Sequence, residues 1–265
     1  MSRYAAMFER LGGEGAFGAF LMLGDPGLET SAALLDAVVA GGADMVEVGI
    51  PFSDPVADGP VIQAAAKRAL DAGVKVADCF DLIADFRSRH PRVPVGILTY
   101  ANLVMARGRD GFFRRAAEAG ADSLLVADVP AREAEPWAAE IRGAGIDPVL
   151  IAASNTPPET LHAIARLGSG YTYCVTRAGI TGGHASASFD HGLIAALRAL
   201  GAPPAVFGFG ISTPDHVAAA MAAGAAGVIS GSAIVAVAAR GGDVAGLVSS
   251  LKQATWERLG SGMID

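Results

Sequence analysis

The alternation of short apolar runs with longer alanine-rich stretches constrains the fold of this chain more than any other feature. Eight runs rich in Val, Ile, Leu or aromatic residues have the length of β-strands. They lie at 17–23, 44–50, 95–100, 122–128, 147–153, 170–176, 204–209 and 226–230. The stretches between them have helical composition. This order of strands and helices is typical of a parallel sheet whose strands are connected by crossover helices.

Eight such units in 265 residues favour a closed barrel over an open doubly wound sheet. An open sheet usually carries a glycine-rich fingerprint after its first strand, and here that turn reads GDPGLET. We therefore expect an α/β protein with a single (β/α)8 TIM-barrel domain over residues 1–265.

Charge and cysteine content exclude several classes of function. The formal net charge of -7 is spread along the chain without a basic stripe, so we expect no nucleic-acid partner. No apolar run free of turn residues reaches membrane-spanning length, and the N-terminal MSRYAAMFERL predicts an amphipathic helix rather than a signal peptide. The two cysteines form no CxxC or Cys/His ligand pattern. We expect a cytoplasmic protein without a metal site.

Glu47 is the strongest single candidate for a catalytic residue. In DMVEVGI, Val46, Val48 and Ile50 share the strand face expected to contact the helices, so Glu47 points into the barrel. Burial would raise the pKa of its carboxyl group toward the range useful for proton transfer. The alternative is an interior glutamate that is satisfied by a neighbouring polar group.

A second carboxylate lies in one of two long polar loops, 51–60 and 178–192, that follow strands and could cover a site. Asp58, in PFSDPVADGP, comes after the strand that carries Glu47, and so lies at the same end of the barrel. An aspartate between turn residues is often only a turn former. Two carboxylates in different environments, however, can divide the roles of acid and base.

Three glycine-containing loops follow the last three strands, at 179–183, 208–212 and 230–233. Backbone N–H groups beside glycine can approach a phosphate closely, and barrels usually bind phosphate at their last strands. Each glycine alone could be a turn residue. Together the loops predict a phosphorylated ligand, with a helix beginning near Gly231.

Other reactive side chains lie where they predict no chemistry. None of the three lysines lies on a predicted strand, so a Schiff-base nucleophile is missing. The five histidines are scattered over helices and loops, and His216 falls in the first turn of a helix that Ser212 or Thr213 caps. Cys174 fits a packing role. What remains is a reaction at a carbon–carbon or carbon–hydrogen bond of a phosphorylated substrate, catalysed by carboxylates alone.

Several motifs, taken in order, resemble one family. GAF-x2-F-x2-LGDP, EVGIPFSDPVADGP, TYANL, LLVADVP, RAGITG, FGFGIS and ISGSAIV are similar to the tryptophan synthase alpha subunit over nearly the whole chain. The resemblance implies a lyase that cleaves indole-3-glycerol phosphate by a retro-aldol reaction. It implies that Glu47 transfers the proton at the indole carbon that loses its side chain. Asp58 would hold and accept the proton of the indole N–H, and Thr181 would orient Asp58. The further substrate-binding residues it implies are Gly182, Gly210, Gly231 and Ser232 for the phosphate, and Phe20, Leu98, Leu125, Tyr173, Phe209 and Ile229 for the indole ring.

The resemblance also implies a partner. Family members form an αββα complex and pass indole to a β subunit that carries pyridoxal phosphate, while the α chain holds no cofactor. Asp54 resembles a position in the segment that contacts the β subunit. Three alternatives stay open: a stand-alone indole-3-glycerol phosphate lyase, a non-catalytic barrel that only activates a β partner, and a phosphosugar isomerase or another barrel enzyme.

Overall fold

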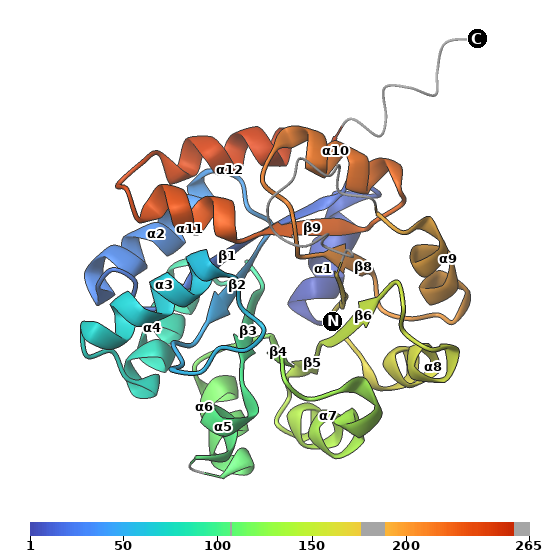
Figure 1. Ribbon diagram of the computed structural model, residues 1–265, viewed down its shortest axis with the longest axis horizontal. Coiled ribbons are helices and arrows are strands. Elements are labelled where there is room, and N and C mark those ends of the chain that lie inside the picture. Colours follow the sequence, from blue (N-terminus) through green and yellow to red (C-terminus); the bar gives the residue numbers. More distant parts are fainter. Residues whose placement is uncertain (107, 176–188, 257–265) are drawn as a thin grey trace.

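The computed structural model describes residues 1–106, 108–175 and 189–256. A ring of parallel strands lies at its centre, and helices surround the ring (Figure 1). The nine strands follow the order β5-β4-β3-β2-β1-β9-β8-β7-β6. This is the (β/α)8 barrel that the sequence predicts.

Every predicted strand is present within one or two residues of its expected ends, and the fifth is divided in two. The strands are β1 (Ala16–Met22), β2 (Met45–Gly49), β3 (Val95–Thr99), β4 (Ser123–Val126), β5 (Asp147–Pro148), β6 (Leu150–Ala153), β7 (Thr172–Val175), β8 (Ala205–Phe207) and β9 (Gly227–Ser230). The division falls at Val149, directly after Pro148, which has no backbone N–H to donate. β5 pairs with β4 and β6 pairs with β7, so the divided strand closes the ring.

The helices of the described residues lie between the strands and at both ends of the chain. They are α1 (Arg3–Leu11), α2 (Leu28–Ala40), α3 (Pro60–Asp71), α4 (Val76–Arg89), α5 (Ala101–Met105), α6 (Arg109–Glu118), α7 (Ala134–Gly143), α8 (Pro158–Leu167), α9 (His191–Ala199), α10 (Pro214–Ala222), α11 (Ser232–Ala238) and α12 (Val244–Gln253), with a 3-10 turn η1 (Ala131–Glu133). The described helices include none that is long and apolar enough to cross a membrane.

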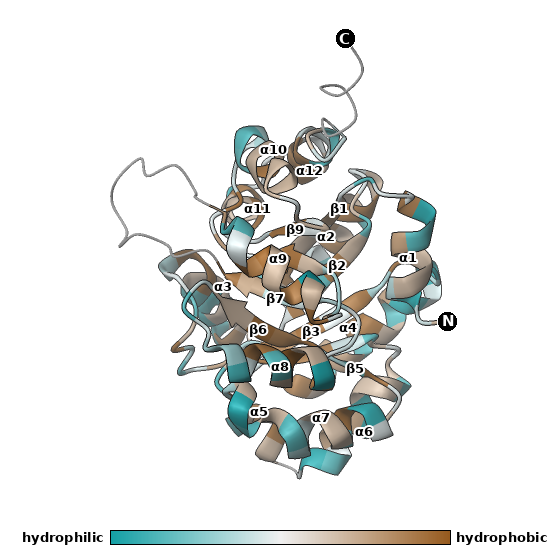
Figure 2. Cartoon of the chain, turned by 90° about the vertical axis from the view of Figure 1, so that its right-hand side faces the viewer, coloured by the Kyte–Doolittle hydropathy of each residue, from teal (hydrophilic) through white to brown (hydrophobic). Residues whose placement is uncertain are grey.

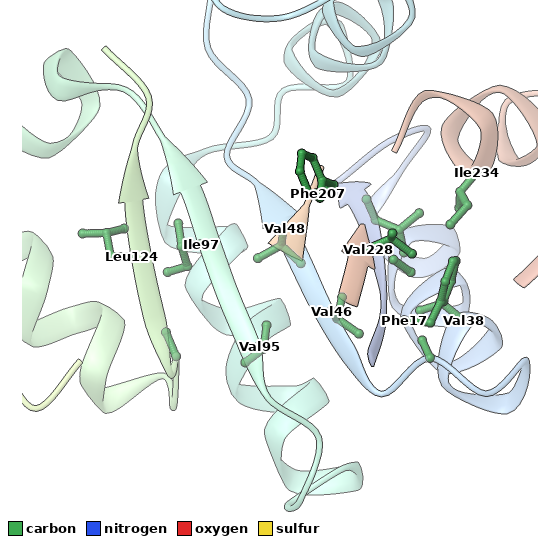
Figure 3. Packing of buried hydrophobic residues seen from close by; sticks show 14 of the residues in the cluster. Phe17, Val38, Val46, Val48, Val95, Ile97, Leu124, Phe207, Val228 and Ile234 are labelled. Atoms are coloured by element: carbon green, nitrogen blue, oxygen red, sulfur yellow. The ribbon is translucent and has the colours of Figure 1, made fainter. Parts of the chain in front are cut away.

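The outer face of the strands packs on the helices. Val46 and Val48 of β2 lie beside Ile97 of β3 and belong to the large cluster that includes Val38 of α2 and Ile234 of α11 (Figure 3). Because successive strand residues point to opposite faces, this packing turns the residues between them toward the barrel axis. The predicted assignment of the two faces of β2 is therefore confirmed.

The barrel interior forms a second cluster that α1 closes at one end. Tyr4, Met7 and Leu11 of α1 pack with interior residues such as Met45 and Tyr171. Viewed from the side, the strands and the helix faces that cover them are hydrophobic, and the outward faces are hydrophilic (Figure 2). The N-terminal helix thus covers the end of the barrel where the strands begin, and leaves the opposite end open.

A buried ion pair also lies at the closed end. Lys252 of α12 donates to Asp44 at 2.7 Å and to the carbonyl of Gly15 at 3.2 Å. Asp44 also accepts the backbone N–H of Phe17 at 2.9 Å. Since Gly15 and Asp44 directly precede β1 and β2, this contact joins the last described helix to the start of the barrel.

Candidate active site

A cavity of about 350 Å³ lies at the end of the barrel where the strands finish. One part of its wall is apolar, and the other part consists of the loops after β8 and β9. Its lining residues are Phe20, Asp58, Gly59, Pro60, Ile62, Leu98, Tyr173, Gly208, Phe209, Gly210, Ile211, Ser212, Gly231, Ser232 and Ala233. This volume falls in the range of small-molecule sites.

A second depression of about 490 Å³ lies on the outside of the barrel between α4, α5 and α6. Phe80, Leu103 and Phe112 are among its apolar lining residues. It contains none of the predicted site residues. We therefore place the candidate active site in the smaller cavity.

Glu47 lies at the centre of the barrel, in the middle of β2. Its register partners are Phe20 on β1 and Gly96 on β3, and only 3% of its surface is exposed. The Tyr171 hydroxyl donates a hydrogen bond of 2.8 Å to its Oε1 atom. Its Oε2 atom is buried and has no hydrogen-bond partner among the residues that the structure describes. One carboxyl oxygen is thus held in place and the other is available.

The environment of Glu47 favours its protonated form. Burial raises the pKa of this carboxyl group, the hydrogen bond from Tyr171 lowers it in part, and the negative charge of Asp58 raises it, so that together they move the pKa from 4.5 to about 7. A pKa near neutrality allows a carboxyl group to give and to take a proton in one reaction cycle. The alternative of an interior glutamate satisfied by a neighbouring polar group describes one oxygen, Oε1, which the Tyr171 hydroxyl satisfies, and does not describe Oε2 among the described residues.

Asp58 is fixed by the turn that leads into α3. The backbone N–H of Asp58 donates to the carbonyl of Pro55 at 3.1 Å, and the Gln63 side chain donates to the backbone carbonyl of Asp58 at 2.7 Å. The Tyr100 hydroxyl accepts the N–H of the preceding Ala57 at 3.2 Å. Asp58 therefore forms part of a turn, as its neighbours suggest, and also lines the cavity.

The Asp58 carboxyl group is half-buried. Burial raises its pKa, and a hydrogen bond from the Tyr100 hydroxyl offsets part of that effect. The pKa of Tyr100 is itself raised by burial and by the charge of Asp58, so its hydroxyl remains a donor. The Tyr100 ring stacks on Phe52 with centroids 5.2 Å apart. These contacts hold the Asp58 carboxyl group at the cavity while it stays partly exposed.

The loops after β8 and β9 meet at the other side of the cavity. Gly210 adopts a φ of 78°, which favours glycine. Ser230, the last residue of β9, donates its hydroxyl to the carbonyl of Ile211 at 2.7 Å. Gly231 is the N-cap of α11, and Ser232 is its first residue. The predicted helix start is confirmed, and the backbone groups of both loops border one space.

Comparison with known proteins identifies the family. A family model described as tryptophan synthase alpha chain matches residues 8–255. The chain is 53% identical over 240 residues to the tryptophan synthase alpha chain of Aeromonas hydrophila subsp. hydrophila, covering 89% of this chain and 90% of that relative. The chain belongs to the tryptophan synthase alpha chain family. The resemblance found in the sequence motifs is confirmed.

Solved structures of tryptophan synthase share the fold. The alpha subunit from Legionella pneumophila str. Paris has a TM-score of 0.84 and 30% identity, covering 96% of this chain and 98% of that one. A chain of tryptophan synthase from M. tuberculosis, in its open form with BRD0059 bound, has a TM-score of 0.86 and 30% identity, covering 98% and 100%. The barrel described above is that of the tryptophan synthase alpha chain.

Most residues that the family resemblance selected lie around one cavity, and four do not line it. Glu47, Leu125 and Ile229 are buried in the barrel interior rather than in the cavity wall. Asp54 is exposed on the loop before Asp58, where Ser53 donates to it. The predicted Thr181 and Gly182, with most of the loop 178–192, lie outside the described residues.

Sequence reasoning missed two tyrosines that contact the carboxylates. Tyr171 shares a strand face with Tyr173, since the two are separated by one residue, so the pattern GYTYCVT could have placed both in the barrel. Tyr100 directly follows β3, at the end of the barrel that carries the site. Its position in TYANL was quoted for the family resemblance but not connected with Asp58. The capping of α10 was predicted correctly, because Thr213 accepts the N–H of His216.

Proposed function

We propose that the chain cleaves indole-3-glycerol phosphate to indole and glyceraldehyde 3-phosphate as the alpha subunit of tryptophan synthase. Membership of the family supports a lyase role in tryptophan synthesis. The observation that carries the proposal is the buried Glu47 carboxyl group in the barrel interior, below the cavity that Asp58 lines. Its pKa is raised to about 7, and its Oε2 atom has no hydrogen-bond partner within the described part of the chain.

In the proposed mechanism the two carboxyl groups have separate roles. Asp58 accepts the hydrogen bond of the indole N–H and stabilises the positive charge that develops on the ring. Glu47, in its protonated form, gives a proton to the indole carbon that carries the side chain. The resulting carboxylate takes the proton of the neighbouring side-chain hydroxyl. The carbon–carbon bond then breaks, its electron pair returns to the ring, and the hydroxyl carbon becomes the aldehyde.

The two parts of the cavity match the two ends of this substrate. Phe20, Leu98, Tyr173 and Phe209 would contact the indole ring, with Leu125 and Ile229 behind them. Backbone N–H groups at Gly210, Gly231 and Ser232 would bind the phosphate. By family resemblance we add Thr181 as the residue that orients Asp58, and Gly182 as a further phosphate contact.

We further propose that this end of the barrel binds a tryptophan synthase β subunit in an αββα complex in the cytoplasm. Exposed hydrophobic side chains lie on segments that follow strands: Val56 is 82% exposed, Met105 is 59% exposed, and Phe209, which lines the cavity, is also exposed. Asp54, in the same loop as Val56, would contact the partner. Pyridoxal phosphate belongs to the β subunit in this proposal, and the α chain uses no cofactor of its own.

The test is cleavage of indole-3-glycerol phosphate by the purified chain, followed through glyceraldehyde 3-phosphate, with and without a tryptophan synthase β subunit. We expect slow cleavage that rises strongly when the β subunit is added. Glu47→Gln removes the proton donor at nearly constant volume, and Asp58→Asn removes the charge at the indole nitrogen, so both variants should lose cleavage. Glu9→Gln, on the exposed face of α1, is the matched control and should cleave like the wild type.

The remaining outcomes separate the alternatives. Fast cleavage that does not respond to the β subunit would favour a stand-alone lyase. Activation of the β subunit by a chain that does not cleave would favour a non-catalytic partner. Absence of both effects would contradict the proposed function.

A further inference from the structure

The last residue of β9 makes a buried contact outside the barrel interior. Ile229 belongs to the interior cluster, and Val228 packs against the helices, so the alternation turns Ser230 toward the outer face. Ser230 has none of its surface exposed, and its hydroxyl donates to the carbonyl of Ile211 at 2.7 Å. No other donor in the described part of the chain hydrogen bonds to this carbonyl.

This hydrogen bond joins the two glycine-containing walls of the cavity. Ile211 lies between Gly210 and Ser212 in the loop after β8, and all three line the cavity. Ser230 directly precedes Gly231, the lining residue at which α11 begins. The two loops are separated by 19 positions in sequence, so the bond fixes the position of one relative to the other.

Other contacts hold the loop after β8 at its two ends. The N–H of Gly208 donates to the carbonyl of Cys174 at 3.1 Å, and the Ser212 hydroxyl lies 3.2 Å from Nδ1 of His216. The Ser230 hydroxyl therefore acts on the middle of the loop. Its removal should shift the carbonyl of Ile211 without releasing the whole segment.

We propose that Ser230 is a positioning residue that holds the N–H groups of Gly210 and Gly231 at the spacing required to bind a phosphate group. The inference rests on the proposed function for the identity of the substrate. Without the hydroxyl, the carbonyl of Ile211 is buried and unpaired, which is unfavourable enough for the backbone to turn toward water. Such a turn moves the adjacent N–H of Ser212, which donates to Nδ1 of His216 at 3.4 Å, and shifts the neighbouring Gly210. The N–H of Gly210 then no longer points well at the phosphate.

The experiment compares Ser230→Ala with the wild-type full chain in direct binding measurements. The probes are inorganic phosphate and glyceraldehyde 3-phosphate for the phosphate end, and indole for the apolar end. We expect the Kd for both phosphate-containing probes to rise about tenfold, as for the loss of one charge-assisted hydrogen bond, and the Kd for indole to stay within about twofold. KM for indole-3-glycerol phosphate should rise by a similar factor, with kcat and its pH profile nearly unchanged.

Thr255→Val is the matched control. Thr255 is also fully buried, and its hydroxyl donates to the carbonyl of Lys252 at 2.8 Å. It lies beside Gly15, at the closed end of the barrel. This variant should lose similar stability and keep the affinity for phosphate. Ser230→Cys, which retains a weak donor of similar size, should fall between Ser230→Ala and the wild type and serves if the alanine variant does not fold.

Three results would overturn the proposal. They are unchanged phosphate affinity in the folded Ser230 variants, equal losses for indole and phosphate, and the same loss of phosphate affinity in Thr255→Val. Failure of the proposed function would look different. The wild-type chain would bind phosphate and lose that binding in Ser230→Ala, yet would not cleave indole-3-glycerol phosphate.

Discussion

Burial of Glu47 should make the stability of the protein depend on pH within a defined window. Burial is the main cause that raises the pKa of this carboxyl group from 4.5 to about 7 in the folded chain. Unfolding exposes the group to water and restores its ordinary pKa. Between these two pH values the folded protein therefore binds one proton more than the unfolded chain, and its stability falls as the pH rises.

The size of this effect follows from the two pKa values. Their difference is about 2.5, and since one pKa unit corresponds to about 1.4 kcal/mol, Glu47 should change the free energy of unfolding by about 3 kcal/mol. The stabilisation by the protonated carboxyl group is complete below about pH 4.5 and is lost as the pH rises through about 7. Glu47→Gln replaces the carboxyl group by a neutral amide of similar shape, so the stability of this variant should lack the pH dependence that Glu47 causes.

The assay is urea unfolding of the wild type and of Glu47→Gln from pH 4 to pH 8. The free energy of the variant minus that of the wild type should rise by about 3 kcal/mol across this range. The other carboxyl groups are present in both proteins, so their contributions largely cancel. Glu9→Gln controls for the loss of a carboxyl group at the surface. A flat difference curve, or one of opposite slope, would refute the argument that burial keeps Glu47 protonated.

Three further predictions concern the contacts around the site and at the closed end. Tyr171→Phe removes the hydrogen bond that lowers the pKa of Glu47, so the titration midpoint of that carboxyl group, measured by ¹³C NMR, should move above about 7; an unchanged midpoint would contradict this. A Cβ atom at Gly208 would lie 2.0 Å from the Tyr173 ring, so Gly208→Ala should displace the ring and lower kcat/KM for cleavage about 100-fold; activity like that of the wild type would show that the ring can move away freely. Lys252→Met leaves the buried Asp44 carboxylate with only the Phe17 N–H at 2.9 Å and the exposed Arg10 guanidinium at 3.5 Å, and should lower the free energy of unfolding by about 2 kcal/mol, with normal cleavage by the folded fraction; equal stability in urea unfolding would refute this.

The barrel could be predicted because the inner and outer faces of each strand need different side chains, and these alternate along the sequence. A parallel strand covered by helices needs aliphatic side chains on its outer face, and Val46 and Val48 meet that need. The period of two residues then places Glu47 inside without any information on its neighbours. For the same reason the strand positions were predicted within one or two residues.

Contacts that depend on the spacing between distant strands could not be predicted in this way. Tyr171 and Glu47 are 124 positions apart, and only closure of the barrel brings them together. The hydrogen bond from Ser230 to Ile211 depends on the path of a loop, for which the sequence shows only glycines. The division of the fifth strand after Pro148 is a third case, because a proline tolerated within a strand is visible only once its neighbours are known.

The pKa of Glu47 is the result of opposed effects: burial and the charge of Asp58 raise it, and the hydrogen bond from Tyr171 to one oxygen lowers it. Without the hydrogen bond from Tyr171, burial would hold the pKa higher, and a carboxyl group that stays protonated is a poor base. Donors to both oxygens would favour the carboxylate at neutral pH, and a carboxylate has no proton to give. Tyr171 occupies Oε1 and leaves Oε2 without a partner among the described residues, so the pKa remains near 7, where both forms are populated. Since no donor of the described residues occupies Oε2, the proton on it is available to a substrate bound above the interior of the barrel.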